Sequence, residues 1–213
     1  MPASITFETF LCFFCFFLFI MGFVEQKKTC LDKLYKPDLS RKGDVDTPLI
    51  PFIDLINSHT NFYTTSSCSG RMVLFTDNGD ERKDTSEWLF VSHEETNFEK
   101  LKPSLEKIPQ SILFFRFEGF ILHVCAKTFE DAKQFLVFAQ NHGYKYTGII
   151  AATKRFIVQV LGVDRFDVPI AKDGKLLVSH EYISSLVDLG NQKLQRTHAG
   201  INRLHEAFKK DFF

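Results

Sequence analysis

Residues 120–152 read FILHVCAKTFEDAKQFLVFAQNHGYKYTGIIAA, which contains two apolar runs on either side of an amphipathic segment. The runs Phe120–Cys125 and Gly148–Ala152 have the length and composition of strands. Between them, Thr128 is a suitable N-cap, apolar residues recur at helical spacing, and Gly143 stands at the C′ position. This stretch therefore predicts a strand–helix–strand unit.

A second unit of the same kind precedes it. A strand is expected at 87–93, a helix near 97–107 with Thr96 and Glu99 as a capping box, and another strand at 112–117. Further strands and a long helix beginning at Ser179 follow the second unit. Because the order is not a strict alternation of strand and helix, we expect an α+β fold. It would be a single mixed-sheet domain with pseudo-duplicated strand–helix–strand halves, no Rossmann core and a long C-terminal helix.

The first twenty residues differ in composition from the rest. They contain seven of the 25 phenylalanines and neither Lys nor Arg. The apolar run at 10–24 is shorter than the roughly 20 residues of a membrane span, and a secretory signal begins with positive charge. A signal peptide or short anchor, a buried helix and an extension outside the fold remain alternatives. We favour the extension, with one domain at 21–213 in the cytoplasm; the alternative is a membrane-attached or secreted protein.

The charges balance, with 26 Lys and Arg against 26 Asp and Glu. This excludes a basic protein that coats nucleic acid, an acidic tail protein and a polybasic membrane binder. Five cysteines are an odd number, and Cys12 and Cys15 have C-x-x-C spacing without a second pair at a zinc-finger distance. We therefore expect neither a disulfide framework nor a structural metal site, and we assign no metal.

Common motifs of nucleotide-binding and hydrolytic enzymes are missing. The chain has no G-x-G-x-x-G, no P-loop, no G-x-S-x-G and no H-E-x-x-H. The segment that stands out is YTTSSCSGR at 63–71, with five Ser and Thr hydroxyls, a glycine and an arginine. Such a bend suits a carboxylate or phosphate, although a hydrated strand connection has the same composition. Cys68 within it is either a nucleophile or a small buried residue.

Other polar candidates are scattered along the chain. His93 and His123 lie in or at predicted strands, where each is a base, a ligand contact or a structural residue. The charged loop 38–46 is a solvated connector or a rim that touches substrate. Lys145 and Tyr146 form a surface turn or an edge that contacts RNA.

Five segments in this order resemble the tRNA wybutosine-synthesizing protein 3 family over about residues 21–205. They are DLSRKGDVD (38–46), YTTSSCSGR (63–71), WLFVSH (88–93), FEGFILHV (117–124) and GYKYTGI (143–149). One departure is Gly119, where the family pattern has proline. The resemblance implies an S-adenosyl-L-methionine-dependent tRNA methyltransferase in wybutosine biosynthesis. Its members methylate the N-4 nitrogen of the 7-aminocarboxypropyl-demethylwyosine intermediate beside the anticodon of phenylalanine tRNA.

The resemblance marks positions, to which we assign roles by chemistry. The proton would be accepted or relayed by Asp46, His93 or His123. The carboxylates of cofactor or substrate would be held by Ser66, Ser67, Ser69, Gly70 and Arg71. Contacts to the tRNA substrate would come from Arg41, Lys42, Tyr63, Lys145 and Tyr146. We expect a monomer that binds the anticodon loop, with other enzymes of the pathway as further partners and no membrane contact. The alternative is a non-catalytic tRNA-binding or assembly factor of the same pathway.

Overall fold

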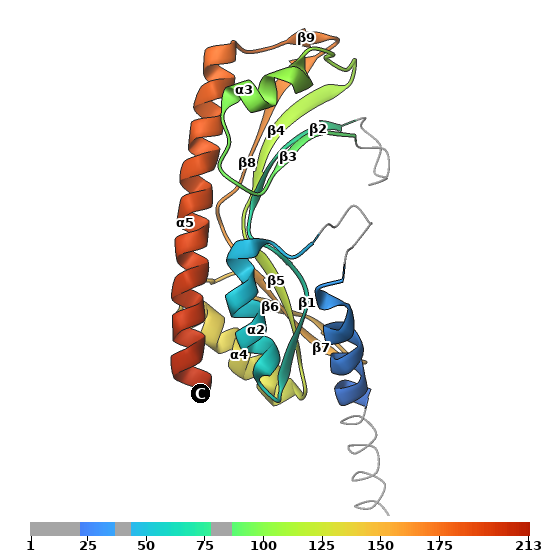
Figure 1. The fold of residues 1–213 in the computed structure, drawn as a ribbon, viewed down its shortest axis with the longest axis vertical. Coiled ribbons are helices and arrows are strands. Elements are labelled where there is room, and N and C mark those ends of the chain that lie inside the picture. The colour runs from blue at the N-terminus through green and yellow to red at the C-terminus, as the bar shows by residue number, and fades with distance from the viewer. Residues whose placement is uncertain (1–21, 37–43, 78–86) are drawn as a thin grey trace, which may run out of the picture.

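The computed structural model describes residues 22–36, 44–77 and 87–213. In this part of the chain the strands form two sheets beside the long helix α5 (His180–Phe212), which runs along both (Figure 1). The four-stranded sheet has the order β1 (Phe62–Cys68), β5 (Ile121–Ala126), β7 (Phe156–Leu161) and β6 (Gly148–Ala152). The five-stranded sheet has the order β3 (Trp88–Ser92), β2 (Arg71–Asp77), β4 (Ile112–Glu118), β8 (Phe166–Lys172) and β9 (Lys175–Leu176).

Helices α2 and α4 lie between α5 and the four-stranded sheet, and α3 lies at the other end of α5 (Figure 1). Their bounds are η1 (Thr47–Leu49), α2 (Ile50–Ser58), α3 (Phe98–Leu101), η2 (Lys102–Leu105) and α4 (Phe129–Asn141). Residues 22–34 form a further helix on the opposite face of the four-stranded sheet (Figure 1). No helix within the described ranges is long and apolar enough to cross a membrane.

The expected α+β class and long C-terminal helix are confirmed, but the expected single mixed sheet is replaced by two sheets. Every strand pair in the described residues is antiparallel. Each predicted strand–helix–strand unit contributes to its own sheet, and a third strand separates its two strands. β2 lies between β3 and β4, and β7 lies between β5 and β6. Strand periodicity does not reveal such insertions, because it reports which face is buried and not which strand is the neighbour.

The expected helix caps are partly confirmed. Thr128 and Asp131 form a capping box at α4, and the Ser179 hydroxyl accepts a hydrogen bond from the backbone of Tyr182 at the start of α5. At α3 the prediction was wrong: Asn97, not Thr96, is the N-cap. The helix is also shorter than expected, because η2 replaces its second half with Pro103 in the first turn.

The chain passes from one sheet to the other at two short connections that lie side by side. β1 continues into β2 through Ser69 and Gly70, and β4 continues into β5 through Gly119 and Phe120. Gly70 has a φ of +104°, and a Cβ there would lie 3.2 Å from the carbonyl oxygen of Glu118. Both the positive φ and the close approach favour glycine. We call this region, where the two sheets meet, the junction.

Helix α5 covers a separate core on each side of the junction. Its first half packs on the five-stranded sheet through Ile183, Val187 and Leu194, and its second half packs on the four-stranded sheet through Ile201, Leu204 and Phe208. A third, small cluster joins the helix at 22–34 to the opposite face of the four-stranded sheet through Phe23, Tyr63 and Cys125. Helix α5 thus connects the two cores that lie on either side of the junction.

We expect Gly119→Ala to destabilise the protein. A Cβ at this position would lie 2.5 Å from the backbone carbonyl oxygen of Asp164, which cannot rotate away as a side chain could. Overpacking of this kind costs about 1–3 kcal/mol in free energy of unfolding. Gly148→Ala is the matched control, because a Cβ there meets nothing within 4 Å. Urea unfolding of both variants measures the difference, and equal midpoints would contradict this account of the junction.

Candidate functional site

The junction brings together residues that lie far apart in the sequence. Ser66 and Cys68 are two residues apart on β1, so their side chains point to the same face. The pairing of β1 with β5 shifts register between Thr64 and Ser66, which places Ser66 opposite His123 and Cys68 opposite Ile121. The face that carries Ser66 and Cys68 is the candidate site.

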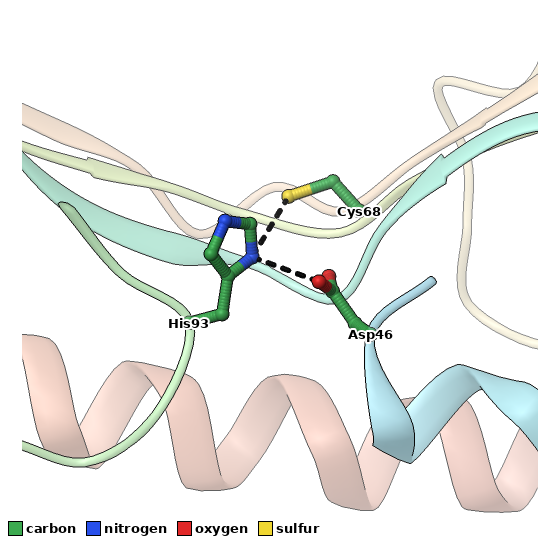
Figure 2. Close-up of side chains that lie close together, drawn as sticks. All are labelled: Asp46, Cys68 and His93. Atoms are coloured by element: carbon green, nitrogen blue, oxygen red, sulfur yellow. Dashed lines mark hydrogen bonds and ion pairs between the residues drawn. The ribbon is translucent and has the colours of Figure 1, made fainter. Parts of the chain in front are cut away.

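Asp46, His93 and Cys68 form a contact cluster at one end of this face (Figure 2). Asp46 immediately precedes η1, His93 immediately follows β3, and Cys68 ends β1. His93 Nδ1 lies 3.1 Å from Asp46 Oδ1 and 3.9 Å from Cys68 Sγ. The backbone N–H of Ser69 donates to Asp46 Oδ2 at 2.5 Å. The cluster therefore ties three separate segments to the junction.

The two charged members of the cluster change each other's pKa. Burial alone would raise the pKa of Asp46, but hydrogen bonds from His93 and from the Ser69 backbone outweigh it and hold this pKa below the usual value. The hydrogen bond to Asp46, followed by the contact with Cys68, raises the pKa of His93 to about 9. Where no other cation contacts the pair, these pKa shifts favour an aspartate and a protonated imidazole at neutral pH.

A second set of polar side chains, beside the cluster of Asp46, Cys68 and His93, forms a row across the four-stranded sheet. The Ser66 hydroxyl lies 2.8 Å from His123 Nδ1, and His123 Nε2 lies 2.9 Å from Gln159 Oε1. Because an amide oxygen only accepts, Nε2–H donates to Gln159 and Nδ1 accepts from Ser66. Gly148 of β6 pairs with Gln159 and ends the row without a side chain. The Ser66 hydroxyl, at the other end of this hydrogen-bonded row, is exposed and can be reached by a ligand.

The other residues that we expected to hold the cofactor do not share one environment. Arg71 Nε donates to Glu118 at 2.6 Å, and its guanidinium stacks 4.4 Å above the Trp88 ring. Ser69 is fully buried, whereas Ser67 is half-buried on β1. The bend therefore does not present its hydroxyls and guanidinium as one continuous surface.

The expected tRNA contacts fall into three groups. Arg41 and Lys42 lie outside the described residues. Tyr63 is 1% exposed, and its hydroxyl donates to Gln26 of the helix at 22–34. Lys145 and Tyr146 are exposed in the turn that leads to Gly148, at the β6 end of the row and three strands away from Ser66.

The sequence did not single out Gln159 or His198. Gln159 is recognisable only from the pairing of β5 with β7, which sets it opposite His123. His198 lies in α5, where burial lowers its pKa while the nearby charges of Asp46 and Glu95 act in the opposite direction. A polar residue at an inward helical position is the only signal that could have marked it.

Several known proteins are similar to this chain in sequence and fold. The family described as Methyltransferase TYW3 matches residues 25–210. The chain belongs to the methyltransferase TYW3 family. Among TYW3 relatives, the "tRNA wybutosine-synthesizing protein 3 homolog" of Danio rerio is 36% identical over 192 residues, which cover 88% of this chain and 75% of the relative.

Two archaeal proteins extend the comparison. A protein of Pyrococcus abyssi is 36% identical over 170 residues, covering 80% of this chain and 82% of the relative. It is named tRNA(Phe) 7-((3-amino-3-carboxypropyl)-4-demethylwyosine(37)-N(4))-methyltransferase 2. The solved structure of the PH1069 protein from Pyrococcus horikoshii superposes with a TM-score of 0.78 at 33% identity, covering 88% of this chain and 96% of that one. The TYW3 fold therefore spans both sheets and the junction.

Proposed function

We propose that this chain transfers a methyl group to the N4 nitrogen of 7-(3-amino-3-carboxypropyl)-4-demethylwyosine in phenylalanine tRNA, in the cytoplasm. Membership of the TYW3 family and the names of the relatives support the reaction. The structural observation that carries it is the hydrogen-bonded row from Ser66 through His123 to Gln159, which offers a proton acceptor at an exposed hydroxyl. Such a group can take the hydrogen that the attacking nitrogen must lose.

S-Adenosyl-L-methionine is the proposed methyl donor, and the polar groups at the junction have the chemistry to hold it. Its carboxylate would accept a hydrogen bond from the half-buried Ser67 hydroxyl of β1, because the single hydrogen of the Ser66 hydroxyl is donated to His123 Nδ1. When bound, the donor supplies a methyl group on a positively charged sulfur.

The residues of the row would handle the proton. The lone pair of N4 would take up the methyl group, the bound donor would keep the electrons of the bond that breaks, and N4 would be left with a hydrogen to lose. The N4 hydrogen then passes to the Ser66 oxygen as the Ser66 hydroxyl proton moves to His123 Nδ1. Gln159 Oε1 keeps the imidazole oriented by accepting from Nε2–H. Every proton thus has an acceptor on the chain.

The position of the site fits a base that has left its stack. Modified bases of single-stranded loops can be splayed out and held on aromatic side chains. Tyr146 is 72% exposed at the β6 end of the row, three strands from Ser66, and Lys145 precedes it, so this turn would contact nucleotides next to the target base. Arg41 and Lys42 would meet phosphates of the anticodon loop. Because the net charge is zero, these local contacts must supply the attraction to RNA.

A methyl-transfer assay tests the proposal. The full chain is mixed with phenylalanine tRNA that carries the unmethylated intermediate and with S-adenosyl-L-methionine labelled in its methyl group. We expect label in the tricyclic base and no label in tRNA that lacks the intermediate. Binding of the tRNA without transfer, with the substrate shown to be intact, would overturn the enzyme and support the assembly-factor alternative.

A further inference from the structure

We infer that Asp46, Cys68 and His93 form a binding site for one divalent transition-metal ion, of which zinc is the best match. The inference stands on the geometry of this cluster and does not depend on the proposed function. Among the described residues, these three side chains offer a carboxylate oxygen, a thiol sulfur and an imidazole nitrogen within 4.8 Å of one another. Mixed oxygen, sulfur and nitrogen donors are the ligands that zinc accepts in proteins.

The direction of the contacts distinguishes an ion site from a proton relay. In a relay the carboxylate and the thiol would contact different nitrogens of the imidazole, so that a proton passes through the ring. Here Asp46 and Cys68 both approach Nδ1, as Figure 2 shows. One N–H bond points at one acceptor, so it cannot serve both well. A cation between the three atoms would satisfy all of them together.

The distances between the donor atoms agree with a tetrahedral ion. Zinc bonds of about 2.0–2.1 Å to nitrogen and oxygen and about 2.3 Å to sulfur place N and O about 3.3 Å apart and N and S about 3.6 Å apart. The observed separations are 3.1 Å from Nδ1 to Asp46 Oδ1 and 3.9 Å from Nδ1 to Cys68 Sγ. These two separations differ from the tetrahedral values by a few tenths of an ångström, and the third, from the Asp46 carboxylate to Cys68 Sγ, is within 4.8 Å.

The surroundings hold the Asp46 carboxylate in place through one oxygen and leave its other oxygen available to an ion. The backbone N–H of Ser69 holds Asp46 through Oδ2, which leaves Oδ1 turned toward His93. Outer hydrogen bonds of this kind fix ligating carboxylates in metal sites. Three protein ligands leave the fourth position open, as in catalytic zinc sites. Because Cys68 and Ser66 share one face of β1, water or a nitrogen or oxygen donor of a substrate at this position would lie beside Ser66.

Cobalt(II) titration tests the site directly. The full chain, without an affinity tag and treated with a chelator, is titrated with cobalt(II), which reports thiolate ligation by a charge-transfer absorption. To silence the C-x-x-C pair, the background carries Cys12→Ser and Cys15→Ser. We expect one ion per chain, the thiolate absorption, its displacement by zinc, and a rise in the thermal unfolding midpoint with zinc.

Three variants assign the ligands. Cys68→Ser should abolish the thiolate absorption, and His93→Ala should weaken binding by more than about 100-fold, beyond the usual effect of an outer-shell change. Cys30→Ser is the control, because Cys30 lies in the helix at 22–34 outside the cluster, and it should bind as the parent does. The proposal is overturned if the parent binds no ion at micromolar cobalt, or if the absorption persists in Cys68→Ser. Either result would leave methyl transfer untouched.

Discussion

Replacing His123 with alanine should lower kcat for methyl transfer by about 100- to 10,000-fold, the range that a positioned proton acceptor contributes. The Ser66 hydroxyl would lose the Nδ1 acceptor at 2.8 Å and could no longer pass on a proton. The KM for tRNA should change little, because no part of the tRNA needs the imidazole for binding in this scheme. Single-turnover transfer of labelled methyl measures the chemical step apart from product release.

Variants of Ser66 separate a relay from a merely structural hydrogen bond. Ser66→Ala should lower kcat nearly as much as His123→Ala, and the double variant should be no slower than the slower single one, because both act in one step. Ser66→Thr keeps the hydroxyl and should recover most of the rate. Additive losses in the double variant, or a fully active Ser66→Ala, would show that His123 does not act through Ser66.

Removing the Asp46 carboxylate should have the largest effect on stability. Asp46→Ala leaves the Ser69 N–H without its acceptor and His93 without its ion-pair partner. Water replaces these contacts poorly, because the Asp46 side chain is only 11% exposed. Losing hydrogen bonds to a charged group costs about 1.5–3 kcal/mol in free energy of unfolding. Urea unfolding in the presence of chelator measures this loss independently of any metal ion.

Two further variants test the cause of that loss. Asp46→Asn retains an oxygen for the Ser69 N–H but removes the charge, so its free energy of unfolding should lie between those of the parent and the alanine variant. Asp211→Ala removes a carboxylate that contacts His142 at 4.0 Å on the surface, and such pairs contribute about 0–1 kcal/mol. An Asp46→Ala variant as stable as Asp211→Ala would mean that the cluster does not hold the junction together.

Local patterns in the sequence were sufficient to predict most of the individual helices and strands. The apolar alternation of β4 and β5, the Thr128 cap and the helical period of α5 each depend on residues close together in the chain. The family resemblance added the motif segments that contain Asp46, His93 and His123. It could not say that Arg71 is engaged by Glu118 and Trp88, because that depends on the pairing of three strands.

Composition, spacing and motif order alone therefore established an α+β chain of this family and the polar segments that carry its chemistry. Only the tertiary structure decided that the strands divide into two antiparallel sheets joined at a bend. It also decided which side chains meet there: Ser66 with His123 and Gln159, and Asp46 with His93 and Cys68. The physical reason is that a strand's sequence determines which of its faces is buried, whereas its neighbours and register follow from packing between distant segments.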